Sequence, residues 1–189
     1  MPRRLSLLRN SRIEICAGIL IAITAIAQEK QDPKHLSREI ATRGAKVVAS
    51  ELWNDPGGLL RVTNHIAGAD PEWIKVGVSL YLASDGAIGE SYGFALARIL
   101  DTKPVVLLRV AVIKSKKHQE LELSDVCGNF GYEESKKNVL AVIEKRLKIL
   151  QTVDDASLQE KKSVCIKEIE NLKGRIPEMF GTHSDKDGR

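Results

Sequence analysis

Four breaks at nearly equal spacing most restrict what this chain can fold into. Asp-Pro steps at residues 55–56 and 70–71 each place a favoured helix-capping residue before a proline, which suits the first position of a helix. Turn residues at 84–86 and at 101–104 repeat the interruption, with Ser84 or Asp85 as the cap, so consecutive breaks lie 15 or 16 residues apart. This rhythm predicts two stacked helical hairpins, and it provides too few units for a solenoid.

The residues between the breaks carry helical periodicity. Segments 36–53, 71–82 and 85–100 each have an apolar stripe near the 3.6-residue period. The apolar run Val105–Ile113 is ambiguous, because its β-branched residues would also suit a buried strand. A lone strand has nothing to pair with, so we interpret this run as a short buried helix.

The C-terminal third predicts two longer helices. Residues 114–132 form a polar connection, and apolar stripes then follow over 132–151 and 155–176. Because only residues 152–155 join these two helices, we expect them to pack antiparallel.

The predicted fold class is all-α. About six or seven helices would form a compact orthogonal bundle or a short helical-hairpin stack that ends in the antiparallel helix pair. A single helical domain would span residues 36–180, after a loose segment at 28–35 and before a disordered tail at 181–189.

Residues 1–27 have the pattern of a signal peptide. Four arginines precede the apolar run Ile15–Ala27, which is 13 residues long and too short to span a bilayer comfortably. Ala25-Ile26-Ala27 gives an A-x-A cleavage site, so Gln28 would begin a periplasmic or secreted protein with no stable membrane insertion. The alternative is an uncleaved segment that anchors the protein in the inner membrane.

The apparent basic character of the chain comes largely from this segment. The chain has a net charge of +4, and the four Arg and one Glu of residues 1–27 account for +3 of it. The remaining sequence is nearly neutral, which excludes a general nucleic-acid-binding surface, because such binding needs concentrated basic charge.

Two cysteines remain after cleavage, Cys127 and Cys165. An even number of cysteines in an oxidising compartment permits a disulfide, and we predict that these two are bonded to each other. The bond would pin the polar connection to the last helix.

Gly89-Glu90-Ser91-Tyr92-Gly93 matches the G-x-S-x-G spacing and is similar to the nucleophile elbow of α/β-hydrolases. That resemblance implies Ser91 as an attacking nucleophile, followed in the chain by an acid and a histidine. Turn residues precede Ser91 where the elbow needs a strand, so we interpret the glycines as sites of close helix packing.

Other catalytic and metal-binding patterns are weak. Asp85 and Glu90 could act as an acid and base pair, but the preferred interpretation is that Asp85 caps a helix and Glu90 faces solvent. The four histidines lie far apart, and the two retained cysteines form no C-x-x-C pair, so we predict no metal and no cofactor.

The aromatic residues concentrate in the first half of the chain. Trp53, Trp73 and Tyr81 are a candidate binding patch, because Trp and Tyr often anchor interfaces. The preferred alternative is that they pack in the core at helix ends.

Three stretches, "GAKVVASELWND", "GADPEWIKVGVSLYLASDGA" and "KPVVLLRV", resemble uncharacterised small helical proteins of proteobacteria that carry signal peptides. The resemblance implies an exported helical domain and no particular activity. The sequence therefore predicts an exported module that binds another protein without catalysis. The alternatives are a small serine hydrolase that uses Ser91 and a membrane-anchored accessory protein.

Overall fold

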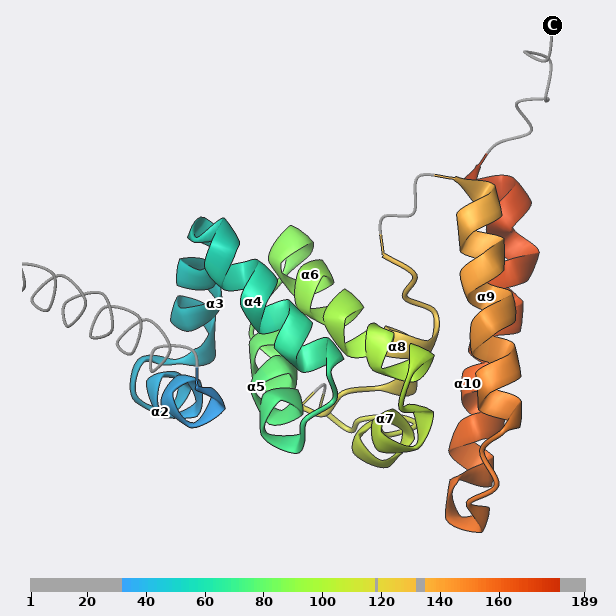
Figure 1. Ribbon diagram of the computed structural model, residues 1–189, viewed down its shortest axis with the longest axis horizontal. Helices are drawn as coiled ribbons and strands as arrows, with labels where there is room; N and C mark the ends of the chain where they lie inside the picture. Colours follow the sequence, from blue (N-terminus) through green and yellow to red (C-terminus); the bar gives the residue numbers. More distant parts are fainter. Residues whose placement is uncertain (1–31, 118, 132–134, 181–189) are drawn as a thin grey trace, which may run out of the picture.

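The computed structural model describes residues 32–117, 119–131 and 135–180, and their regular structure is helical (Figure 1). The all-α prediction is confirmed, since the sole β-type pairing among these residues is an isolated bridge between Val112 and Glu122. The α-helices are α2 (Pro33–Arg43), α3 (Ala45–Asn54), α4 (Pro56–Ala67), α5 (Pro71–Leu82), α6 (Gly86–Ala97), α7 (Pro104–Val110), α8 (Leu123–Cys127), α9 (Lys136–Gln151) and α10 (Gln159–Met179), with 3₁₀ turns η1 (Arg98–Asp101) and η2 (Ala156–Leu158).

The expected signal peptide at 1–27, the first half of the expected loose segment and the tail at 181–189 lie outside the described residues. Within the described parts of the chain, no helix is both long and apolar enough to cross a membrane.

The first expected helix is two helices in the structure. Gly44 separates α2 from α3 with a φ of +90°, a conformation that residues with a side chain rarely adopt. Helix α2 also begins at Pro33, earlier than predicted, because the Asp32 carboxylate accepts a hydrogen bond from the Lys34 amide at 3.2 Å. Residues 33–35 are therefore helical and do not belong to a loose segment.

Three of the predicted breaks begin a helix through different contacts. Asp70 caps α5 as expected, accepting from the amides of Glu72 at 3.0 Å and Trp73 at 3.3 Å. Asp55 and Asp85 occupy the equivalent positions before α4 and α6, but neither side chain makes a capping hydrogen bond. Pro56 and the turn at Gly86 are what mark those helix starts in the sequence.

The ambiguous apolar run is a helix for most of its length. Helix α7 covers Pro104–Val110, and the chain then extends so that the Val112 amide donates to Leu121 O and the Leu123 amide to Val112 O, both at 2.8 Å. The connection after it holds the short helix α8, which the sequence analysis missed. A reciprocal capping box between Glu122 and Asp125 begins α8.

Helices α2 to α6 occupy one half of the molecule, and α9 and α10 lie side by side at the opposite end (Figure 1). Two buried connections join the halves. The predicted disulfide between Cys127 and Cys165 is present, with a Cα–Cα distance of 5.3 Å, and links α8 to α10. Arg146 of α9 is fully buried and contacts Asp101 of η1 through its Nε at 2.8 Å.

Candidate functional site

The three aromatic residues of the expected binding patch lie in different environments. Trp73 is only 7% exposed, and its ring stacks on His65 with 4.6 Å between ring centres. Tyr81 is partly buried, and burial, reinforced by Asp125, raises its pKa to about 12. Trp53 is 39% exposed on α3. The packing interpretation therefore describes Trp73, and Trp53 is the aromatic residue that is left available to a partner.

Ser91 lies in the middle of α6, with no strand leading to it within the described residues that precede it. Its Oγ donates a hydrogen bond to Ala87 O of the preceding turn at 2.9 Å, a common arrangement for a helical serine. A Cβ on Gly93 would lie 3.0 Å from Tyr81 Cε2, so this glycine allows α6 to approach α5 closely. The motif is helix-packing sequence in this structure.

Asp85 and Glu90 both line a small cleft of about 380 Å³ between α5, α6 and the segment before α8. Tyr81, Glu120 and Asp125 share that cleft. The Asp125 carboxylate already accepts a hydrogen bond from the Glu122 amide at 3.0 Å, as part of the capping box that begins α8. In the described parts of the chain, no group of three or more His, Cys, Asp or Glu side chains is arranged to hold a metal ion.

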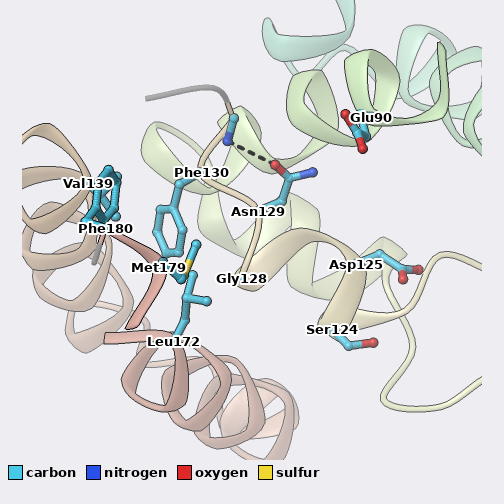
Figure 2. Close-up of a pocket in the computed structure, with 11 residues that line it drawn as sticks. Glu90, Ser124, Asp125, Gly128, Asn129, Phe130, Val139, Leu172, Met179 and Phe180 are labelled. Atoms are coloured by element: carbon cyan, nitrogen blue, oxygen red, sulfur yellow. Dashed lines mark hydrogen bonds between the residues drawn. The ribbon is translucent and has the colours of Figure 1, made fainter. Parts of the chain in front are cut away.

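A second cleft, of about 430 Å³, lies where α8 and the loop after it meet α9 and α10 (Figure 2). One side is apolar, with Phe130, Met179 and Phe180, and the other carries Glu90 and Asp125. The Asn129 side chain accepts from the Gly131 amide at 3.1 Å, which holds the loop in place. Gly131 and Phe180, the last residues of two described segments, are among its lining residues.

A third hollow is bounded entirely by continuous helices, and we take it as the candidate site. This α3–α4–α6 groove has a volume of about 440 Å³ and brings Trp53 and Ser91 together. Its lining consists of Trp53, Pro56, Leu59, Leu60, Thr63, Asn64, Ser91, Phe94, Ala95 and Arg98.

The α3–α4–α6 groove offers apolar contact along most of its length. Leu60 is 62% exposed at its edge, although large apolar side chains are usually buried in water-soluble domains. The Thr63 hydroxyl, like that of Ser91, donates to its own helix, at 2.9 Å to Leu59 O. These hydroxyls have therefore used their one donor, and contact in this part of the groove depends mainly on apolar surface.

One end of the groove is polar. Arg98 Nη1 donates to Asn64 Oδ1 at 3.4 Å, which joins the last turn of α4 to the start of η1. Arg98 is the one charged residue in the lining and is exposed. The groove thus runs from an apolar end at Trp53 to a cationic end at Arg98.

Sequence reasoning identified Trp53 and Ser91 but missed Leu60, Phe94 and Arg98. Leu59 and Leu60 were a usable signal, because adjacent residues point about 100° apart on a helix and a short surface helix buries one face. Phe94 and Arg98 gave no such signal, since their importance depends on how α6 packs beside α4.

No protein-family model matches the chain. Comparisons with curated proteins and with solved structures also found no match.

Proposed function

We propose that this protein is an exported helical module that binds another protein through the α3–α4–α6 groove and performs no catalysis. One observation carries the proposal: Trp53 and Leu60 remain exposed beside a groove whose hydroxyl groups are already hydrogen-bonded within their own helices. Burying a large apolar side chain contributes about 1.5–3 kcal/mol, so covering these two would supply substantial binding energy.

A hydrolase that uses Ser91 receives less support. A serine nucleophile needs a base within hydrogen-bonding reach, usually a histidine or a carboxylate-assisted partner. The residues that line the groove around Ser91 include no histidine and no carboxylate. The arrangement of helices fits a scaffold instead, and we propose that α3 to α6 form a short helical-hairpin stack, closed by α9 and α10 as an antiparallel pair.

Export is supported by the buried disulfide, because such bonds persist in oxidising compartments and are rare in the cytosol. It is also supported by the signal-peptide pattern of residues 1–27. We expect protein recovered from the periplasm or medium to begin at Gln28, as measured by intact-mass spectrometry. A protein that retains Met1 in the membrane fraction would contradict cleavage and favour the anchored alternative.

The binding function can be tested without knowing the partner. We expect a displayed library of random peptides of about 16 residues, roughly four helical turns, to yield binders to the oxidised protein. Their affinity should fall about tenfold or more in Leu60→Asp, because the new carboxylate replaces apolar contact and must be desolvated. Fluorescence anisotropy with labelled peptides gives the dissociation constants.

Val110→Asp is the matched control, because Val110 is another exposed apolar residue, 40% exposed on α7 and outside the groove. It should leave the affinity unchanged within about twofold, as expected for an exposed site outside the interface. Peptides that bind Leu60→Asp as tightly as they bind the wild type would place binding on another surface.

A further inference from the structure

We propose that the ligand of the α3–α4–α6 groove is an amphipathic helix of a partner protein, and that an acidic side chain of this helix pairs with Arg98. This inference rests on the proposed function and specifies the chemistry of the partner. It follows from three properties of the groove: the secondary structure of its walls, the charge at one end and the openness of its rim.

The walls favour a helical ligand. The residues that line the groove belong to α3, α4 and α6 and to the 3₁₀ turn that continues α6, so most of their main-chain groups are engaged within helical turns. An extended peptide binds well where a sheet edge offers free N–H and C=O groups, and these walls offer no such edge. A helix satisfies its own main-chain hydrogen bonds and needs only side-chain contact from the groove.

The charge at one end favours an acidic ligand. Arg98 has no carboxylate within ion-pair distance in the described parts of the chain. Carboxylates that flank the groove in sequence have other partners: Asp101, three residues after Arg98, binds the buried Arg146, and Asp55, beside Pro56, faces Arg61 at 3.8 Å. The groove therefore presents one available cation and no competing anion.

The rim favours a macromolecular partner over a small amphiphile. Small-molecule sites enclose most of the ligand surface, whereas Trp53 and Leu60 project from this rim into solvent. These side chains can be covered only by a surface that extends beyond the groove. A partner helix that lies along α4 and α6 provides such a surface.

The length of the groove sets the spacing in the ligand. Ser91 and Arg98 lie seven residues apart on one face of α6 and its continuation, which corresponds to about 10 Å at 1.5 Å per residue. In a helical ligand, an apolar residue would contact the groove near Ser91 and Trp53. The acidic residue that pairs with Arg98 would then lie four or seven positions away on the same face of that helix.

The test compares the sequences of library peptides selected by the wild type and by Arg98→Glu. We expect wild-type binders to combine a bulky apolar residue with Asp or Glu at one of these two spacings. Arg98→Glu should lose that preference, select Lys or Arg there, and bind the wild-type peptides on the order of tenfold more weakly. Arg98→Lys should keep the acidic preference, because it keeps the charge.

Arg175→Glu is the matched control, since Arg175 is exposed on α10, outside the groove, and its change alters the net charge equally. It should select the same peptides as the wild type. Peptides that depend on Leu60 but show no acidic preference would overturn this inference and leave the groove function standing. Peptides that ignore Leu60→Asp would overturn the proposed function as well.

The same selection separates a protein partner from a small amphiphile. Trp53 reports directly on the groove, so bound peptides should shift its fluorescence emission to the blue. If no peptide is selected and dodecanoate alone produces that shift, the groove binds small amphiphiles and the inference is wrong.

Discussion

Removing the disulfide should lower the free energy of unfolding by about 4 kcal/mol, because Cys127 and Cys165 are 38 residues apart and the bond restricts a long loop in the unfolded chain. The variant to measure is Cys127→Ala/Cys165→Ala, which removes both buried sulfur atoms and leaves small apolar side chains. Urea unfolding followed by circular dichroism gives the stability of the oxidised wild type, the reduced wild type and the variant.

The reductant provides an internal control for this prediction. Reducing the wild type should lower its stability toward that of the variant, whereas reductant should not change the variant. Two free thiols per chain in denaturant without reductant, or equal stability of the oxidised wild type and the variant, would contradict the role assigned to the bond.

Removing the disulfide should destabilise the α9–α10 end of the molecule more than the rest. The bond ties α8 to α10, and α9 packs alongside α10 (Figure 1). Native-state hydrogen exchange should therefore quicken most in α9 and α10, while the amides of α4 and α6 change less.

The sequence predicted helices well where the residues that start a helix lie within one turn of each other. The Asp-Pro steps at 55–56 and 70–71 begin α4 and α5 because each proline suits the first turn of a helix, and at α5 the Asp70 side chain also caps that turn. Helix α8 was missed because five residues are too few to show a period. Its Glu122-x-x-Asp125 pattern resembles a capping box with an acidic cap and was the one available clue.

Features that depend on contacts between residues far apart in the sequence were harder to predict. The disulfide was predictable because assigning Cys16 to the expected signal peptide left Cys127 and Cys165 as a single pairing. The groove itself was not predicted: among its lining residues, the sequence analysis named Trp53 as part of a possible aromatic patch and Ser91 as an alternative nucleophile. Trp73, which the sequence placed in the same patch as Trp53, is buried against His65. Burial of an aromatic residue is decided by what packs over it, which its local period does not specify.

Arg146 is another residue whose contacts the local sequence does not predict, and substituting it should have the second large effect on stability. It falls on the stripe of α9 that also includes Val139, Ile143 and Leu150, so a helical wheel places a charge among core residues. Its partners, Asp101 and the carbonyl of Asn129, are 45 and 17 residues away in sequence. The helical pattern shows a charged residue at a core position, and contacts with residues distant in sequence explain why it is there.

The Arg146 guanidinium joins three parts of the structure. It contacts Asp101 through Nε at 2.8 Å and Nη2 at 3.4 Å, and Nη1 donates to Asn129 O at 2.6 Å. The guanidinium carbon also lies 4.9 Å from the centre of the Phe130 ring, within cation–π range. One side chain thus connects η1, the loop after α8 and α9.

Arg146→Met should lower the free energy of unfolding by about 3–5 kcal/mol, because it leaves the Asp101 carboxylate and the Asn129 carbonyl without their partner in a largely buried region. Arg146→Lys should fall between the wild type and Met, since an ammonium group keeps the charge but cannot reproduce the planar set of contacts. Urea unfolding of the oxidised protein measures both.

Two comparisons separate this network from a general effect of losing an arginine. Arg175→Met, on the exposed face of α10, should change the stability by no more than about 0.5 kcal/mol. Adding Asp101→Asn to Arg146→Met should cost less than Asp101→Asn costs in the wild type, because the ion pair is already broken, with a coupling of about 0.5–3 kcal/mol. If Arg146→Met is no more destabilising than Arg175→Met, or the two changes are additive, then the buried pair does not hold α9 to the rest of the molecule, and the disulfide is the principal connection between the halves.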